Sequence, residues 1–243
     1  MSSSEESLDV IAVGAHPDDC EIGCGGTLAA LASVGLKVGI IDLTNGEPTP
    51  NCPDPAIRIE EANQAAEVLG VTKRVILDLP NRKLFDTFDA RCALAIEFRK
   101  YRPKIVIGIG GKTPTASPDH WQAMQITDAA VFYSRLSKWE NHFDGLPVHR
   151  IERQLYYSFF FESDWSGAGP RQFVYDIGNH LETKMQSVAC YRTQFPGEKK
   201  YVFERVRSMA IACGQSAGFV AGEPLTSVRP LGSQNLLQTL GLS

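Results

Sequence analysis

Short apolar runs alternate with segments of helical spacing from Asp9 to about Tyr133. Runs rich in Val and Ile are typical of strands that are buried in a parallel sheet. Four such runs predict strands over residues 9–13, 37–43, 74–77 and 104–109. Apolar positions at helical spacing predict helices between them, over residues 26–34, 57–69 and 88–101. Glycines or a proline follow these helices closely, as expected at helix ends.

The pattern changes after Arg150, where strand-like and helix-like segments no longer alternate regularly. Strands are predicted over residues 154–161 and 172–175, and helices over residues 177–191 and 202–213. Alternating strands and helices are typical of an α/β fold, so we expect a mainly parallel sheet with helices on both faces. We expect one domain over residues 1–243, in which a smaller C-terminal α+β part, from about residue 151, caps the core.

Composition excludes several classes of function. The net charge of -4 and the pI near 5.8, without any basic run, argue against nucleic acid as a partner. No apolar stretch approaches the roughly 18 to 20 residues that a membrane span requires, and the first residues lack the features of a signal peptide. We therefore expect a cytoplasmic protein whose six cysteines are reduced thiols.

Candidate chemistry is concentrated in two clusters that follow predicted strands. Ala15-His16-Pro17-Asp18-Asp19-Cys20-Glu21 comes directly after the first strand, and Ser117-Pro118-Asp119-His120 comes after the fourth. In open α/β sheets, ligands bind at the carboxyl ends of the strands, where loops hold side chains on a rigid frame. Long loops over residues 45–55, 110–117 and 163–170 are expected to form pocket walls.

Three residues of the two clusters make up a candidate metal site. Catalytic zinc typically has three ligands of the His and Asp/Glu type, and it keeps a fourth position for water. His16, Asp19 and His120 supply this set, so we predict that they bind Zn²⁺. Asp18 stands beside one ligand and is placed to accept a proton from water as a general base.

The first cluster has two other interpretations. Cys20 and Cys24 are four residues apart and could serve as soft zinc ligands, but the simpler interpretation is that they are small packing residues. The glycines that follow, Gly23, Gly25 and Gly26, let the backbone pass close to a ligand. A dinucleotide-binding dehydrogenase is a weak alternative, because these glycines do not make the G-x-G-x-x-G fingerprint and the preceding acids would repel a pyrophosphate.

The first cluster resembles the Ala-His-Pro-Asp-Asp-x-Glu signature of the LmbE-like, or PIG-L-type, zinc-dependent carbohydrate de-N-acetylases. The resemblance extends over nearly the whole chain. It includes Gly25-Gly26-Thr27, Leu43-Thr44-Asn45-Gly46-Glu47, Arg58-Ile59-Glu60-Glu61-Ala62, Leu69-Gly70-Val71, Pro118-Asp119-His120, Lys184 and Tyr191-Arg192-Thr193-Gln194-Phe195. The later segments are most similar to the bacterial branch that deacetylates N-acetylglucosaminyl-malate on the way to bacillithiol.

The resemblance implies a Rossmann-like sheet, zinc held by the same three residues, and Asp18 as the general base. It further implies that Arg58 contacts the substrate and that Tyr191 hydrogen-bonds the developing oxyanion. A guanidinium suits an acidic aglycone because it can bind two oxygens at once. The implied substrate is a small N-acetylated sugar conjugate, from which an acetyl group is removed by hydrolysis, and the implied assembly is a homo-oligomer.

One departure from the family pattern bears on activity. The second motif commonly reads His-x-Asp-His, whereas this chain has Ser117 in place of the first histidine. Serine cannot carry positive charge, and losing one charged donor or general acid typically costs about 10²–10⁴ in rate. The alternative function is therefore a zinc-retaining, sugar-binding relative with little or no deacetylase activity. Asp119, also a candidate catalytic residue, is expected to act as a partner to a histidine, and Asn81 stands where relatives often have aspartate.

Overall fold

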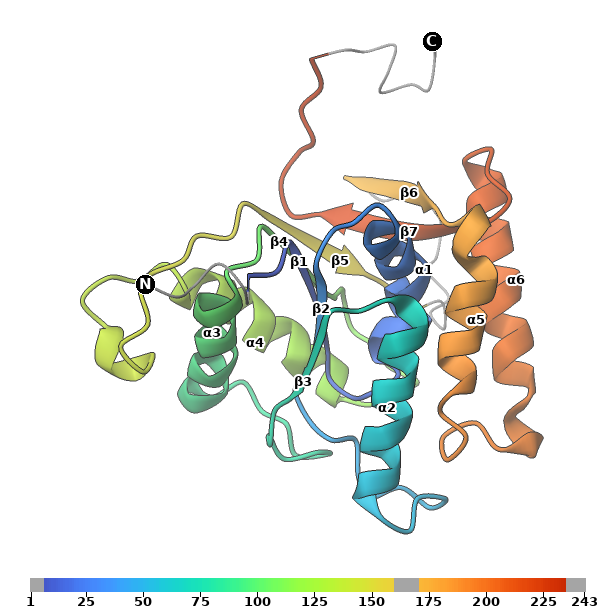
Figure 1. Cartoon of the computed structure of the whole chain (residues 1–243), viewed down its shortest axis with the longest axis horizontal. Helices are drawn as coiled ribbons and strands as arrows, with labels where there is room; N and C mark the ends of the chain where they lie inside the picture. The colour runs from blue at the N-terminus through green and yellow to red at the C-terminus, as the bar shows by residue number, and fades with distance from the viewer. Residues whose placement is uncertain (1–6, 160–170, 235–243) are drawn as a thin grey trace.

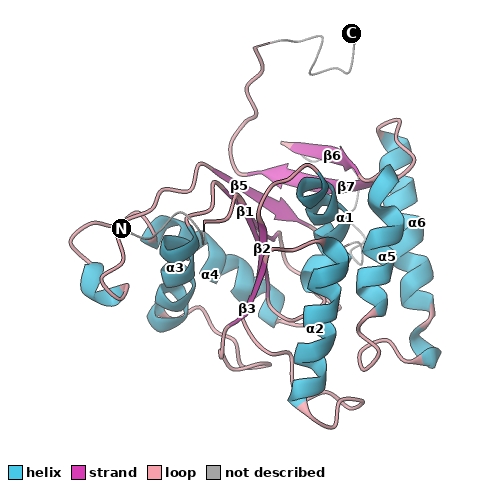
Figure 2. Ribbon diagram, viewed as in Figure 1, coloured by secondary structure: helices cyan, strands magenta, loops and turns pink. Residues whose placement is uncertain are grey.

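Seven strands form one sheet within residues 7–159 and 171–234, the part of the chain that the computed structural model describes (Figures 1 and 2). The strand order is β3-β2-β1-β4-β5-β7-β6. The strands are β1 (Val10–Gly14), β2 (Val38–Asp42), β3 (Lys73–Ile76), β4 (Ile105–Ile109), β5 (Arg153–Tyr157), β6 (Gln172–Asp176) and β7 (Gly222–Ser227).

The first five strands are parallel, and β7 runs antiparallel to both β5 and β6. From β1 the chain proceeds to β2 and β3 on one side, and it then crosses to β4 and β5 on the other side. Strand β1 is buried along its whole length, which explains its continuous apolar run. The order therefore creates a topological switch point between β1 and β4, where open α/β sheets bind ligands.

Helices cover both faces of the sheet, as Figure 2 shows. One side carries α1 (Asp19–Ser33), α2 (Pro55–Leu69), α5 (Leu181–Ala189) and α6 (Tyr201–Ser216), and the other carries α3 (Phe88–Tyr101) and α4 (Asp119–Tyr133). Single 3-10 turns lie at η1 (Glu140–His142), η2 (Gly178–His180) and η3 (Gly197–Lys199). This arrangement confirms the predicted α/β fold. None of the described helices is both long and apolar enough to cross a membrane.

The beginning of α1 corrects one prediction. The helix begins at Asp19, not at residue 26, so the glycines expected to approach a ligand lie inside it. A Cβ at Gly23 would lie 2.2 Å from the ring of Tyr157, and one at Gly26 would lie 2.5 Å from the side chain of Ile177. Because real Cβ atoms do not approach other atoms this closely, these two glycines allow α1 to pack tightly against β5 and the segment after β6.

The C-terminal part extends the sheet. The helix predicted over residues 177–191 is a 3-10 turn followed by α5, and the strand predicted from residue 154 ends at Tyr157. Strand β7 was not predicted, because its Gly-Glu-Pro start is typical of a turn. The buried Glu223 carboxylate in β7 accepts hydrogen bonds from the Gly26 and Thr27 amides and from Lys184 Nζ. The loop predicted over residues 163–170 lies outside the described residues.

Candidate metal centre and active site

The candidate metal ligands meet at the switch point between β1 and β4. His16 lies in the loop after β1, Asp19 is the first residue of α1, and His120 lies in the first turn of α4, which follows β4. One possible ligand atom from each residue lies within 4.8 Å of the other two, and all three residues are buried. The structure therefore brings His120 to His16 and Asp19, which precede it by about a hundred residues in the sequence.

Backbone amides hold the carboxylate of Asp19 in place. Its Oδ2 atom accepts hydrogen bonds from the amides of Ala15 and His16, at 2.8 and 2.9 Å. The other oxygen, Oδ1, lies 3.4 Å from Nε2 of His120. Burial opposes ionisation here, but His120 and His16 outweigh it and hold the pKa of Asp19 well below its usual range. Asp19 is thus a fixed anion between two imidazoles.

Each histidine has an orienting partner. Nδ1 of His120 lies 2.9 Å from the hydroxyl of Thr113, and its ring stacks on Phe159 at a centroid distance of 4.7 Å. Nε2 of His16 lies 3.3 Å from Oδ2 of Asp119. Burial disfavours the charged form of His16, yet hydrogen bonds to Asp119 and Asp19 raise its pKa to about 10. Partners of this kind fix the ring orientation of histidines that bind metals.

The donor set fits a divalent metal. Imidazole and carboxylate are the ligand types of catalytic zinc, and the acidic surroundings that hold a proton on His16 favour a bound cation. In the part of the chain that the structure describes, one group of three or more His, Cys, Asp or Glu residues has ligand atoms close enough to hold a metal ion, and it is this trio. Cys20 and Cys24 are not part of it. Both are fully buried in the core, where Cys20 Sγ lies 4.0 Å from the Tyr157 hydroxyl.

Asp18 has an unusual backbone conformation. Its φ of 115° lies in the left-handed region, which costs a non-glycine residue about 1–3 kcal/mol. The amide of Ile22 donates to the Asp18 carbonyl at 3.0 Å, and this bond helps to hold the turn. The carboxylate lines the same cavity as the metal trio. Burial raises the pKa of Asp18 to about 7, although Arg58 acts in the opposite direction.

Arg58 supports this turn from α2. Nη2 donates to the Pro17 carbonyl at 2.7 Å and lies 3.4 Å from Asp18 Oδ2. Nη1 donates to the Gly46 carbonyl at 2.7 Å and lies 3.4 Å from Glu47 Oε1. The side chain is only 4% exposed, although it lines the cavity. Its two terminal nitrogens are thus engaged by the protein, in contrast to the substrate contact that the family resemblance implies.

A cavity of about 300 Å³ opens beside the metal trio. Its polar wall includes Asp18, Arg58, Asn81 and Arg82. Its apolar wall is formed by Ile22, Phe159, Phe195 and Val202. A polar wall facing an apolar wall suits a sugar, because a pyranose ring presents hydroxyl groups on its edge and C–H bonds on its faces.

The structure does not bring Tyr191 to this cavity. The side chain is fully buried, and its hydroxyl donates to Glu21 Oε1 at 2.9 Å. The same carboxylate pairs with Arg74, which also binds Asp42. Tyr191 therefore belongs to a buried polar network beneath the site, and its position corrects the expectation that it contacts an oxyanion. The sequence motif does not show in which direction the hydroxyl points.

Ser117 lines the cavity at the beginning of α4. Its hydroxyl accepts a hydrogen bond from the Asp119 amide at 3.2 Å, and its carbonyl accepts one from the His120 amide at 3.2 Å. The serine thus satisfies a free amide at the helix start, which is a common use of this residue type. It supplies no positive charge to the cavity.

Several residues of the site gave no separate signal in the sequence. Thr113 orients His120, and the Arg82 amide donates to Asp119 Oδ2 at 2.6 Å. Phe159 forms part of the wall behind His120. Arg82 could have been suspected, since it stands next to Asn81 in a motif of the family, but single threonines and phenylalanines are too common to be noticed.

Comparisons with known proteins agree with this geometry. Residues 11–131 match the family model described as PIG-L: GlcNAc-PI de-N-acetylase. Diacetylchitobiose deacetylase of Thermococcus kodakarensis is 31% identical to this chain over 222 residues, which is 86% of this chain and 79% of that protein. The chain belongs to the PIG-L family and is an N-deacetylase, which confirms the family resemblance seen in the sequence.

Solved structures show the same fold. The conserved protein TT1542 from Thermus thermophilus superposes with a TM-score of 0.81 at 32% identity, covering 93% of this chain and 97% of that one. The N,N'-diacetylchitobiose deacetylase from Pyrococcus horikoshii superposes with a TM-score of 0.79 at 25% identity, covering 93% of this chain and 85% of that one.

Proposed function

We propose that this chain is a zinc-dependent hydrolase that removes the acetyl group from an N-acetylglucosamine conjugate similar to N-acetylglucosaminyl-malate. The observation that carries the proposal is the convergence of His16, Asp19 and His120 within 4.8 Å, beside Asp18 and a cavity of about 300 Å³. The related chitobiose deacetylases support an N-acetylated glucosamine as the substrate class.

His16, Asp19 and His120 would hold the metal. When bound there, zinc would act as a Lewis acid and lower the pKa of a water molecule toward neutrality. Asp18 takes a proton from the attacking water and returns it to the departing nitrogen, so that the acetamide C–N bond breaks to give acetate and an amine. Burial raises the pKa of the Asp18 carboxyl, which favours its acting as donor as well as acceptor.

Arg58 acts in this scheme as a positioning residue. Its contacts with the Pro17 carbonyl and with Asp18 hold the general base in its left-handed turn. Arg82 is the better candidate for binding an acidic aglycone. It lines the cavity, its side chain is exposed, and it forms no ion pair with a described residue. A free guanidinium can bind a carboxylate through two parallel hydrogen bonds.

An acetate-release screen tests the proposal. Purified protein with one equivalent of zinc is incubated with N-acetylglucosaminyl-malate and with N,N'-diacetylchitobiose, and acetate is measured enzymatically. We expect turnover that requires zinc. We also expect Arg82→Gln to raise KM for the malate conjugate but not for the neutral disaccharide. Zinc and sugar binding without acetate release from any glucosaminide would contradict the proposal.

The alternative function is a sugar-binding relative that retains zinc and turns over slowly. The position of Ser117 in the cavity wall favours it, because the serine supplies no charge to the site. Ser117→His separates the two functions. A large gain in kcat would show that the wild-type chain lacks a catalytic group, whereas an unchanged kcat would show that another residue serves in its place. A homo-oligomeric assembly and a cytoplasmic location stay predictions.

A further inference from the structure

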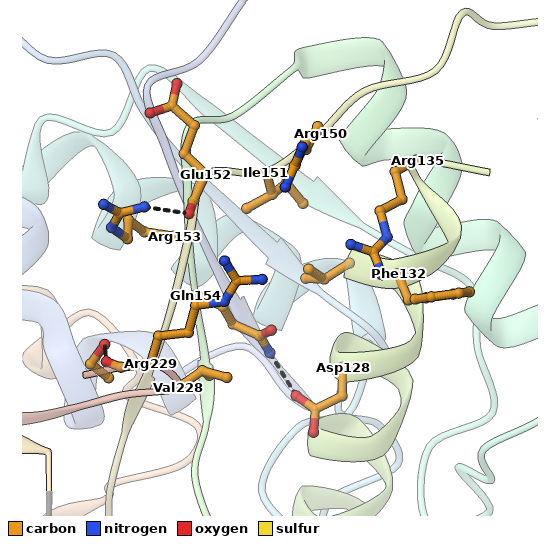
Figure 3. Close-up of a pocket in the computed structure, with 12 residues that line it drawn as sticks. Asp128, Phe132, Arg135, Arg150, Ile151, Glu152, Arg153, Gln154, Val228 and Arg229 are labelled. Atoms are coloured by element: carbon orange, nitrogen blue, oxygen red, sulfur yellow. Dashed lines mark hydrogen bonds between the residues drawn. The ribbon is translucent and has the colours of Figure 1, made fainter. Parts of the chain in front are cut away.

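A second and larger cavity, of about 410 Å³, lies at the opposite ends of the parallel strands. Figure 3 shows residues that line it. The cavity is bounded by the end of α4, the beginning of β5 and the segment after β7. Because β5 is parallel to β4, its first residue lies at the amino ends of the parallel strands, whereas the metal trio lies at their carboxyl ends. The lining residues are Asp128, Val131, Phe132, Arg135, Arg150, Ile151, Glu152, Arg153, Gln154, Ser227, Val228 and Arg229.

Four arginines line this cavity, and all four are exposed. None of them forms an ion pair with a carboxylate among the described residues. Arg135 lies over the ring of Phe132 at 4.5 Å, and Arg153 donates to the neighbouring Glu152 carbonyl at 2.9 Å. Arg150 and Arg229 extend over the same hollow from different segments (Figure 3). Like charges are thus gathered on a chain whose net charge is -4.

Nearby acceptors do not neutralise these arginines. The Asp128 carboxylate accepts hydrogen bonds from Gln154 Nε2 at 2.6 Å and from the Tyr156 hydroxyl at 2.8 Å. The carbonyl of Tyr133 at the end of α4 accepts from Arg99, which comes from α3. The Asp128 carboxylate and the Tyr133 carbonyl are therefore already bonded to other residues, and the Glu152 side chain, the other carboxylate in the lining, forms no ion pair with these arginines.

The frame of the cavity is tied together by backbone hydrogen bonds. The His149 amide donates to the Ser134 carbonyl at 2.8 Å and fixes the loop before β5 to the end of α4. The Val228 amide donates to the Gln154 carbonyl at 3.2 Å and fixes the segment after β7 to β5. The backbone that carries the arginines is thus set before any ligand binds, which lowers the entropic cost of binding.

We propose that this cavity binds a multiply charged anion, a small metabolite that carries phosphate or carboxylate groups. Arg153 points to the other face of β5, because its neighbours Gln154 and Tyr156 both reach Asp128 of α4. The guanidinium groups of Arg135, Arg150 and Arg229 face one hollow and repel one another unless an anion lies between them, and each can bind two oxygens of such a group. The volume matches the lower range of pockets for small molecules. Asp128, the first lining residue in α4, is eight residues from His120, roughly 12 Å along the helix axis, and the two cavities share no lining residue, so the anion is not the substrate of the metal centre.

Calorimetric titration of the zinc-loaded enzyme tests the site, with fructose 1,6-bisphosphate as the phosphate probe and propane-1,2,3-tricarboxylate as the carboxylate probe. At about 0.15 M salt we expect one of them to bind with a Kd below about 1 mM. The variant that combines Arg150→Gln and Arg229→Gln weakens this binding by at least about tenfold per arginine. Arg205→Gln removes one positive charge from α6 and leaves the Kd unchanged.

Three results would overturn the proposal. The first is the absence of binding of either probe at about 10 mM. The second is equal affinity in the double variant, which would place the anion elsewhere. The third is dissociation of an oligomer by the double variant, measured by light scattering, which would show that the arginines join two copies of the chain. Circular dichroism confirms that the variants fold, and Arg150→Lys, which retains the charge, should lose less affinity than Arg150→Gln.

Discussion

The carboxyl ends and the amino ends of the parallel strands, here called the carboxyl edge and the amino edge, differ in how their charged side chains are buried and paired. At the carboxyl edge, His16, Asp19 and His120 are buried, and each is bonded to further groups. At the amino edge, four arginines are exposed, and none of them forms an ion pair with a carboxylate of the residues that the structure describes. Burying a charge is tolerated only when it is paired, whereas an exposed charge can stay free for a ligand.

One histidine at each edge shows the effect of these surroundings. At the acidic edge, burial opposes protonation of His16, but Asp119 and Asp19 raise its pKa to about 10. At the basic edge, burial and Arg102 lower the pKa of His149 below its usual value. The comparison shows that carboxylate partners outweigh burial at His16, whereas burial is the largest cause at His149 and prevails there.

Removing a metal ligand should have the largest effect. We expect His120→Ala to lower kcat/KM at least about 10³-fold, because a Lewis acid contributes several kcal/mol to the transition state and each 1.36 kcal/mol is a factor of ten. Arg205→Gln, on the exposed side of α6, is the matched control and should retain activity. Acetate release and the zinc content of both variants check this expectation. Full activity of the His120→Ala variant would show that the reaction does not depend on the site at the carboxyl ends of the strands.

The proposed general base should come next. Asp18→Asn keeps the size of the side chain and leaves the three ligands in place, but it cannot accept a proton. We expect kcat to fall about 10²–10⁴-fold at unchanged zinc content. A drop in zinc content that equals the drop in activity would instead identify Asp18 as part of the metal site.

Asp119→Asn should have a moderate effect. The substitution removes the charge that faces His16 at 3.3 Å, while the amide oxygen can still accept from the Arg82 amide. Partners of metal-binding histidines are typically worth about 10–100-fold in metal affinity or activity. Competition with a zinc indicator measures the affinity, and excess zinc should restore much of the lost rate. Failure of zinc to restore it would point to a direct catalytic role.

The pH dependence at the basic edge should be the smallest effect. Since the pKa of His149 is lowered in the folded state, the contribution of this residue to stability is present above pH 6.5 and is lost as the pH decreases through 6.5. Urea unfolding of the wild type and of His149→Gln, which can still donate to the Pro103 carbonyl, isolates this contribution at pH 7.5 and 5.5. The wild type should lose stability relative to the variant at pH 5.5, and a difference that does not change with pH would be contrary to this account.

The parallel half of the fold could be predicted from the sequence because β1, β2 and β4 are apolar runs that alternate with helical segments. The convergence of His16, Asp19 and His120 could be predicted because they stand in two short motifs after β1 and β4. Strand β7 was missed because it contains Gly222, Glu223 and Pro224, which are typical of turns. Its position depends on Lys184 and on the start of α1, and such long-range contacts leave no local pattern.

The sequence also could not predict the direction in which individual side chains point. Tyr191 and Arg58 stand in family motifs, yet the former points into a buried network and the latter is engaged by Pro17, Asp18 and Gly46. The arginine cavity was not foreseen, because its charges come from three separate segments that only the fold brings together.

Zinc stoichiometry measured together with acetate release tests the central claim most directly. The purified protein is stripped with a chelator, titrated with zinc and assayed at each step on N-acetylglucosaminyl-malate. The account predicts one zinc ion per chain, activity that rises in proportion to the bound zinc, and loss of both in His120→Ala. Full acetate release by the metal-free protein, or zinc binding that persists in His120→Ala, would contradict it.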